Sequence, residues 1–143
     1  MSTAQQILDS RHNNRIWSVS PEIMVFDAIK EMDKHGVGAL LVVEGEDLSG
    51  IISERDYTRK IALKDKSSHS TKVSEIMTRD VFTVQKDEST DNCIRYMHDR
   101  GFRHLPIMDG EKVIGMLSIK DVLGAMLSEK DELINQLEHY ISG

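Results

Sequence analysis

The sequence contains very little of what several classes of protein require. Its 143 residues include one cysteine, Cys93, so the chain alone forms neither an intrachain disulfide nor a thiolate zinc cluster. No hydrophobic run approaches the roughly 18 residues of a membrane-spanning helix, and residues 1–14 lack the apolar core of a signal peptide. These absences predict a cytoplasmic protein without a membrane partner.

An excess of positive charge is also missing. The chain has 18 Lys and Arg against 24 Asp and Glu, a net charge of −6. Nucleic-acid binding requires a basic surface, so we expect no nucleic-acid partner. Hydrophobic residues at 39% and charged residues at 29% are ordinary for a globular protein.

Signatures of catalysis and metal binding are absent as well. The sequence has no P-loop, no glycine-rich dinucleotide fingerprint and no nucleophile triad, and its six histidines lack metal-ligand spacing. Cys93 falls on the apolar face of an expected helix, where it is predicted to be a small buried residue. We therefore expect no enzyme, no catalytic cofactor and no metal site.

What the sequence does contain is an internal repeat. A shift of 65 residues aligns residues 16–57 with 81–122 without a gap, and ten of the 42 pairs are identical, where chance gives about two or three. The identical pairs are Val19/Val84, Ile29/Ile94, Met32/Met97, Gly36/Gly101, Leu40/Leu105, Gly45/Gly110, Glu46/Glu111, Gly50/Gly115, Ser53/Ser118 and Asp56/Asp121. Trp17/Phe82 is a conservative pair. The fold must contain two copies of one unit.

Each copy predicts a β-α-β-β-α unit. Short strands are expected at residues 16–19 and 81–84, followed by helices with apolar residues at helical spacing that end at Gly36 and Gly101. Two apolar runs then form a hairpin, at 39–43 with 48–52 and at 105–108 with 113–117. A second helix is expected to begin near Ser53 and Ser118.

These units define the predicted fold class, which is α/β (α+β). Two repeats pack about a pseudo-two-fold axis, because one unit is too small to bury its sheet alone. We assign residues 1–65 to the first repeat with a short N-terminal helical segment, 64–72 to a linker, 73–128 to the second repeat and 129–143 to an amphipathic C-terminal helix.

The most specific repeated pattern is G-x-x-S-x-x-D, at residues 50–56 and 115–121. A serine followed three residues later by an acid, at a strand-to-helix junction, is typical of a capping box. The same geometry also suits a ligand, with the serine near a phosphate and the acid accepting from ribose hydroxyls. The glycine favours the second interpretation, because glycine within a strand often marks close backbone approach.

The duplicated unit and its two motifs resemble a tandem pair of cystathionine-β-synthase (CBS) domains, the Bateman module. The resemblance covers about residues 4–128, and stand-alone bacterial proteins that bind NAD and AMP are especially similar. It implies adenosyl ligands, such as AMP, ATP or NAD, in clefts between the repeats. In each copy the aspartate, Asp56 or Asp121, would bind the ribose, and Ser53 or Ser118 would lie near the phosphate.

Further ligand-binding residues follow from this resemblance. The adenine pockets would use Ser18 and Val19 with Val37, Gly38 and Ala39, and Thr83 and Val84 with Arg103, His104, Leu105 and Pro106. Cations near the motifs, Arg55, Arg59, Lys60 and Lys120, would suit a phosphate, although Arg59 and Lys60 equally suit a solvated helix face. Arg103 and His104 align with Gly38 and Ala39, so the two clefts are not expected to be equivalent.

The sequence therefore predicts a regulatory module that senses an adenosine nucleotide or NAD(H). Its output would go to its own oligomer, a homodimer by family resemblance, or to an unidentified effector protein. The alternative is a ligand-free structural or dimerisation module whose serine and aspartate only cap helices.

Overall fold

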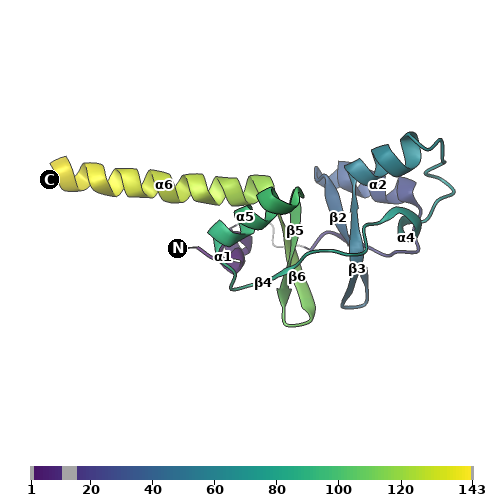
Figure 1. Ribbon diagram of the computed structural model, residues 1–143, viewed down its shortest axis with the longest axis horizontal. Coiled ribbons are helices and arrows are strands. Elements are labelled where there is room, and N and C mark those ends of the chain that lie inside the picture. The colour runs from purple at the N-terminus through teal and green to yellow at the C-terminus, as the bar shows by residue number, and fades with distance from the viewer. Residues whose placement is uncertain (1, 11–15, 143) are drawn as a thin grey trace.

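The computed structural model describes residues 2–10 and 16–142 and contains the two repeats side by side (Figure 1). The first repeat comprises β1 (Ser18–Val19), α2 (Val25–His35), β2 (Ala39–Glu44), β3 (Asp47–Ser53), α3 (Glu54–Tyr57) and the π-helix η1 (Thr58–Ala62). The second comprises β4 (Val84–Gln85), α5 (Thr90–Arg100), β5 (His104–Asp109), β6 (Lys112–Ser118) and α6 (Ile119–Ser142). Two short helices precede the repeats, α1 (Ala4–Ser10) and α4 (Val73–Ile76). The predicted α/β fold of two repeats is confirmed.

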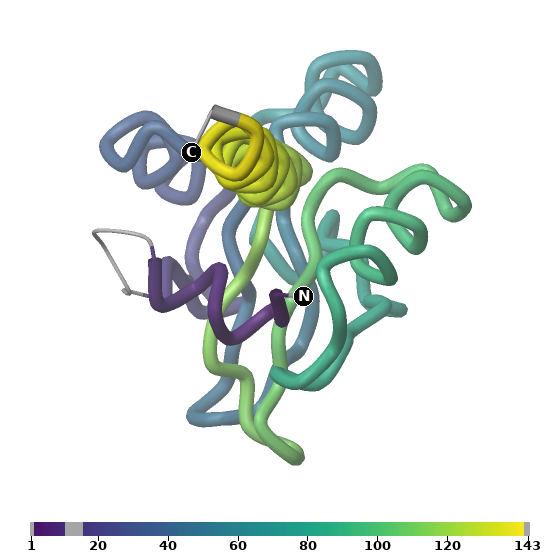
Figure 2. The backbone as a smooth tube through the Cα atoms, turned by 90° about the vertical axis from the view of Figure 1, so that its left-hand side faces the viewer, coloured from purple at the N-terminus to yellow at the C-terminus, as the bar shows by residue number. Residues whose placement is uncertain are grey.

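The two sheets have the same topology and the same register. In each, a short first strand runs parallel to the second strand, which forms an antiparallel hairpin with the third. Val42 pairs with Gly50 in one sheet and Ile107 with Gly115 in the other, and both ladders shift register at the next residue. Both hairpins point to the same side of the molecule (Figures 1 and 2). The sheets touch through β3 and β6.

Glycine ends the first helix of each repeat, as predicted. Gly36 and Gly101 adopt left-handed conformations, with φ of 65° and 74°, and their N–H groups bond carbonyls of the last helical turn. A side chain would strain this conformation, which explains why both copies have glycine there.

The first strands are shorter than expected. Only Ser18–Val19 and Val84–Gln85 pair with their neighbours, whereas the sequence predicted strands over 16–19 and 81–84. The apolar residues Trp17, Val81 and Phe82, which suggested longer strands, instead lie beside cavities between the repeats. Hydrophobicity alone could not distinguish these two environments.

The segments that precede the repeats are exchanged between the two cores. Helix α1 contributes Ala4, Ile7 and Leu8 to the core of the second repeat. The segment before the second repeat contributes Val73, Ile76 and Met77 to the core of the first. Residues 1–65 therefore lack part of the first core and supply part of the second. The expected division at residues 64–72 separates the repeats in sequence but not in space.

This exchange also explains the glycines of the repeated motif. A Cβ at Gly50 would lie 2.5 Å from the backbone oxygen of Thr78, which pairs with Ile51 in an isolated bridge. A Cβ at Gly115 would lie 2.9 Å from a methyl group of Leu8. The predicted close approach at these glycines is confirmed, but the group that approaches each glycine belongs to an exchanged segment and not to a ligand. Neither glycine lines the large cavities of the described chain.

The C-terminal tail is helical, as predicted, but it is continuous with the second helix of its repeat. Helix α6 extends over 24 residues with no break at the expected boundary between 128 and 129. Its far half projects beyond the rest of the described chain (Figure 1). Among the described helices, none combines the length and apolar character needed to cross a membrane.

The two motif glycines are expected to differ in their tolerance of a methyl group. Gly50→Ala should lower the free energy of unfolding by about 1–3 kcal/mol, because the clashing carbonyl belongs to paired backbone. Gly115→Ala should cost less than about 1 kcal/mol, because the Leu8 side chain can change rotamer. Urea unfolding monitored by circular dichroism measures both values.

Gly124→Ala is the matched control, since nothing lies within 4 Å of its Cβ position in helix α6. This change should stabilise the helix by up to about 1 kcal/mol. Equal losses at Gly50 and Gly115 would contradict the contrast between a backbone and a side-chain neighbour.

Candidate functional site

Two cavities lie between the repeats, and each contains one copy of the Ser/Asp motif. The larger, here named the Asp121 pocket, has a volume of about 790 Å³. The smaller, the Asp56 pocket, has a volume of about 550 Å³. Both volumes fall within the range of small-molecule sites.

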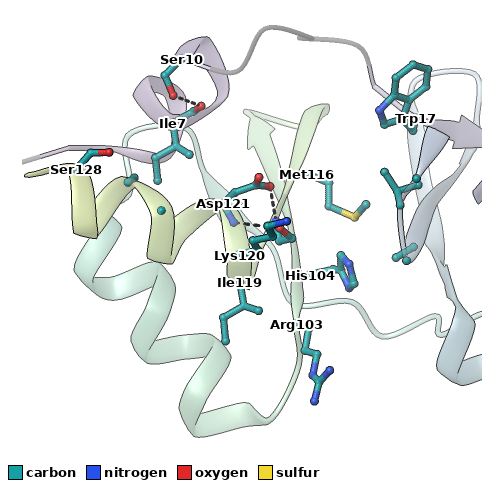
Figure 3. Close-up of a pocket in the computed structure, with 17 residues that line it drawn as sticks. Ile7, Ser10, Trp17, Arg103, His104, Met116, Ile119, Lys120, Asp121 and Ser128 are labelled. Carbon is teal, nitrogen blue, oxygen red and sulfur yellow. Dashed lines mark hydrogen bonds between the residues drawn. The ribbon is translucent and has the colours of Figure 1, made fainter.

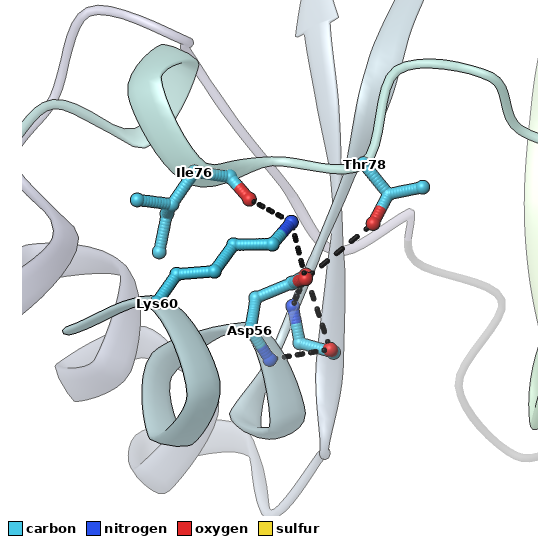
Figure 4. Close-up of polar contacts among 5 residues, drawn as sticks. Asp56, Lys60, Ile76 and Thr78 are labelled. Carbon is cyan, nitrogen blue, oxygen red and sulfur yellow. Dashed lines mark hydrogen bonds and ion pairs between the residues drawn. The ribbon is translucent and has the colours of Figure 1, made fainter. Parts of the chain in front are cut away.

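Asp56 is the centre of a polar network (Figure 4). Its carboxylate accepts from the Ser53 backbone N–H at 2.9 Å and from the Ser53 hydroxyl at 3.1 Å. Thr78 donates to the other carboxylate oxygen, and the Lys60 ammonium lies 3.0 Å from the same atom. Lys60 also donates to the carbonyl of Ile76 at 2.7 Å. These contacts hold the Asp56 carboxylate, which is only 10% exposed, against the exchanged segment.

The second motif has the same reciprocal cap. The Ser118 N–H donates to the Asp121 carboxylate at 2.8 Å, and the Asp121 N–H donates to the Ser118 hydroxyl at 3.1 Å (Figure 3). The capping role predicted for both motifs is thus confirmed. A cap does not exclude a ligand, because both motifs also line a pocket.

Each pocket combines the motif of one repeat with an aromatic residue from the other. In the Asp121 pocket, Trp17 from the first repeat lies across the cavity from Asp121 of the second (Figure 3). In the Asp56 pocket, Phe82 comes from the segment that leads into the second repeat. Neither pocket exists in one repeat alone.

Three residues line both pockets: Gly38, Arg103 and His104. Both helices that follow a motif are bonded to this region through their first residue. The Glu54 N–H donates to the Gly38 carbonyl at 3.0 Å, and the Ile119 N–H donates to the Arg103 carbonyl at 2.8 Å. A Cβ at Gly38 would lie 3.5 Å from the Glu54 carboxylate and 3.8 Å from the His104 ring. A methyl group at Gly38 would therefore make only ordinary van der Waals contacts with the wall between the pockets.

Burial lowers the pKa of His104 below its ordinary value. The carboxylates of Asp121 and Glu54 oppose this effect, and Arg103 adds to it. His104 is therefore predominantly neutral at pH 7, and acid adds a positive charge to the wall shared by the two pockets.

The cations are distributed unequally. Arg55, Arg59 and Lys60 line the Asp56 pocket. The positions 65 residues further along are Lys120, Gly124 and Ala125 in the Asp121 pocket. Replacement of two long cationic side chains by two small residues fits the larger volume of that pocket. The acids Glu54 and Asp80 also line the Asp56 pocket, so the two linings differ in the number of cations and not in net charge.

The structure gathers most residues predicted from the sequence at these two cavities. The Asp121 pocket includes Val37, Gly38, Ala39, Arg103, His104, Ser118, Lys120 and Asp121. The Asp56 pocket includes Gly38, Ser53, Arg55, Asp56, Arg59, Lys60, Arg103 and His104. Six predicted residues line neither: Ser18 is exposed, Val19 and Thr83 are partly buried, and Val84, Leu105 and Pro106 are buried.

Several lining residues were not selected from the sequence. Trp17 and Phe82, one residue before the predicted Ser18 and Thr83, are the most prominent. Their alignment across the repeat was a usable signal, since an aromatic residue recurs at that position. Thr78 and Met116 had no such signal, because their places depend on the packing of the two repeats.

Cys93 is buried, as predicted. Burial, with a smaller contribution from Glu88, raises the pKa of its thiol to about 11, so the reactive thiolate is scarce at neutral pH. Within residues 2–10 and 16–142, no group of three or more His, Cys, Asp or Glu side chains is arranged to hold a metal ion.

Comparison with known proteins identifies the family. The CBS domain model matches residues 10–63 and 73–128. The chain belongs to the CBS-domain family. The two matches are the two repeats, so the chain contains a tandem CBS pair, which is a regulatory module.

Three relatives illustrate the similarity. A CBS-domain protein of Burkholderia ambifaria MC40-6 is 44% identical, with a TM-score of 0.85 over 89% of this chain and 95% of that one. The mitochondrial CBS domain-containing protein CBSX3 of Arabidopsis thaliana is 41% identical over 133 residues, which span 90% of this chain and 64% of the plant protein. The CBS domain pair of protein MJ0100, solved with 5′-methylthioadenosine and S-adenosyl-L-methionine, is 25% identical with a TM-score of 0.78, over 90% and 98% of the two chains.

The lowered pKa of His104 predicts a pH-dependent contribution to stability. The unfolded chain binds a proton near the ordinary pKa of histidine, whereas the folded chain binds it only at lower pH. The stabilisation is therefore complete above the ordinary pKa and is lost as the pH falls towards the folded value. Relative to His104→Gln, the wild-type CBS pair should lose free energy of unfolding between pH 7.5 and 5.5.

His98→Gln provides the control, because the His98 side chain is 86% exposed. Denaturant unfolding at several pH values compares the three proteins. If the wild-type protein and His104→Gln respond equally to acid, burial of a neutral His104 is not supported.

Proposed function

We propose that this CBS pair senses adenosyl nucleotides, with AMP, ATP and NAD(H) as the candidate ligands, and passes the bound state to its own assembly or to an effector protein. The observation that carries the proposal is the composition of the two pockets. Each is lined by an acid and a hydroxyl from one repeat and by an aromatic side chain from the other. A ligand in such a pocket contacts both repeats and favours one relative arrangement of them.

The chemistry of the pockets suits the parts of an adenosyl ligand. An aromatic ring offers a stacking face for adenine. The aspartate carboxylate accepts hydrogen bonds from ribose hydroxyls, as acids do in dinucleotide sites. The serine hydroxyl and nearby cations provide charge-assisted bonds to phosphate. The adenosyl ligands bound to the MJ0100 pair support the same ligand class.

The two pockets differ enough to select different ligands. Arg55, Arg59 and Lys60 offer more donors for phosphate in the Asp56 pocket, although the acids Glu54 and Asp80 line it too, so we expect this pocket to bind the ligand with more phosphate groups. The Asp121 pocket has fewer cations and more room beside Gly124 and Ala125, so it favours a ligand with less phosphate charge.

A ligand in the Asp56 pocket would have to compete with the polar network already present there. The Lys60 ammonium sits 3.0 Å from the Asp56 carboxylate. A ribose that bonds this carboxylate would displace Lys60 or share the acid with it. Release of Lys60 would also break its bond to the Ile76 carbonyl in the exchanged helix α4. Through this route, ligand binding would loosen the hold of the first core on helix α4, which leads into the second repeat.

The ribose assignment predicts a loss of affinity when either motif acid is neutralised. Asp56→Asn or Asp121→Asn should weaken its own site roughly 10- to 150-fold, from loss of about 1.5–3 kcal/mol of charge-assisted bonding. Asparagine retains an oxygen that can accept the capping bond, so the fold should survive. Titration calorimetry with AMP, ATP, NAD and NADH measures the affinities, and circular dichroism checks the fold.

The exposed Asp99→Asn change is the control and should leave every affinity unchanged. Unchanged affinity for all adenosyl ligands in the Asp56→Asn/Asp121→Asn double variant would disprove the ribose assignment. Absence of binding to the wild-type chain would instead favour the alternative, a ligand-free structural module. Turnover of a bound nucleotide would contradict the expectation that the protein is not an enzyme.

The difference in phosphate charge can be tested at Arg59. Arg59→Gln should reduce the affinity for ATP roughly two- to tenfold, because one exposed charge-assisted bond is lost, and should leave adenosine unaffected. Arg95→Gln removes the same charge from a surface outside both pockets and serves as the control. An equal effect of Arg59→Gln on ATP and adenosine would contradict a phosphate contact.

The remaining parts of the proposal concern assembly and location. The family resemblance implies a homodimer that buries helix faces including residues 119–127. Light scattering at micromolar concentration tests the number of chains. The single cysteine favours the cytoplasm. If ligand binding does not change the oligomeric state, the signal would pass to a separate effector protein.

A further inference from the structure

The aromatic residue of each pocket is covered by a basic side chain that lines neither cavity. His35 stacks on Trp17, with the ring centroids 3.7 Å apart and an angle of 23° between the ring planes. The Arg100 guanidinium lies 4.2 Å from the centre of the Phe82 ring. Neither basic residue lines the two pockets. Any effect of these two residues on a bound ligand would therefore pass through the aromatic ring.

The two contacts occupy equivalent positions in the two repeats. Trp17 and Phe82 are 65 residues apart, and so are His35 and Arg100. His35 is the last residue of helix α2 and Arg100 is the last residue of helix α5, and a left-handed glycine follows each. The same backbone position thus presents a basic side chain to the same aromatic position, although the residue types differ between the repeats.

The aromatic residues lie where the paired strands do not hold them. Trp17 precedes β1 and Phe82 precedes β4, and both side chains are only partly buried. A partly buried side chain outside a strand retains rotamer freedom, and the loss of this freedom on binding a ligand costs free energy. We propose that His35 is a positioning residue that holds Trp17 as the wall of the Asp121 pocket. Arg100 has the same role towards Phe82 in the Asp56 pocket.

The basic residues also have a simpler explanation, which is the helix dipole. Cations in the last turn of a helix interact favourably with the dipole, and Lys34 occupies that turn together with His35. Lys34 is exposed, whereas His35 is partly buried against Trp17. The His35 Nε2 also lies 3.1 Å from the Glu31 carboxylate, one turn earlier in α2. The dipole requires neither contact, so Lys34 provides the means to separate the two roles.

The two walls are supported by different chemistry. A guanidinium over the face of a ring is a cation–π contact with a permanent charge. Phe82 also contacts Tyr96 and Phe102, at ring-centroid distances of 4.9 and 5.8 Å. Loss of Arg100 would leave both of these ring contacts in place. The Trp17 wall is therefore the better place to test the role of the basic residue.

The stack on Trp17 limits how a base can bind in the Asp121 pocket. His35 occupies one face of the indole, so a base can stack only on the opposite face. Fixing the indole before the ligand arrives strengthens binding, because less freedom is lost. The effect on ligand affinity rests on the proposed function, whereas the effect on the position of Trp17 does not.

The first test observes Trp17 in the absence of ligand. Trp17 is the single tryptophan, so the tryptophan fluorescence of the full chain reports on its surroundings. His35→Ala should shift the emission to longer wavelength and increase quenching by acrylamide, because one face of the indole is uncovered. His35→Arg copies the second repeat and should restore both values. Lys34→Ala removes a cation from the same turn and should change neither.

Circular dichroism checks that each variant remains folded. An emission spectrum unchanged by His35→Ala, or shifted equally by Lys34→Ala, would overturn the positioning role. Failure of His35→Arg to restore the spectrum would contradict the equivalence of the two positions.

The second test measures AMP binding from the change in Trp17 fluorescence, which reports on the Asp121 pocket. His35→Ala should weaken binding about two- to tenfold, the effect of one aromatic pair. His35→Arg should restore the affinity, and Lys34→Ala should leave it unchanged. An affinity unaffected by His35→Ala would show that the stack does not prepare the wall for a ligand.

The two tests distinguish failure of this inference from failure of the proposed function. If calorimetry detects no binding of AMP, ATP, NAD or NADH to the wild-type chain, the proposed function fails. The ligand-free spectra would still decide whether His35 holds Trp17 in place.

Discussion

The exchange of leading segments between the two cores is the constraint on which the rest of the structure depends. Helix α1 fills the second core with Ala4, Ile7 and Leu8, and the segment around α4 fills the first. Burial of these apolar side chains is the main favourable contribution available to each small sheet. Because each repeat needs a segment placed before the other, the two cores fold as one unit, and their relative orientation is fixed by packing.

That orientation creates the pockets. It carries Trp17 to the motif of the second repeat and Phe82 to the motif of the first, and it makes Arg103 and His104 common to both cavities. It also places Thr78 and Ile76, on the exchanged segment, in contact with Asp56 and Lys60. The acid that we assign to ribose binding is thus bonded to the contact between the repeats. We propose that this connection carries the effect of an occupied pocket to the assembly.

The serine and aspartate of each motif illustrate how one arrangement supports two roles. Both pairs cap the helix that follows, and both face a cavity large enough for a nucleotide. The sequence left these two interpretations open, and the structure shows that the cap does not remove the pocket. The motif glycine, in contrast, belongs to packing alone, since Gly50 contacts Thr78 and Gly115 contacts Leu8.

The sequence by itself determined the duplication, the order of helices and strands, the glycine caps and the two Ser/Asp motifs, because these follow from local periodicity and from the alignment of two copies. Only the tertiary structure decided which core each leading segment completes, that Trp17 and Phe82 line the pockets, and that α6 continues past residue 128. Those features depend on contacts between residues far apart in the chain. The hydrophobicity of a side chain predicts that it will be buried, but it does not predict which residues will cover it.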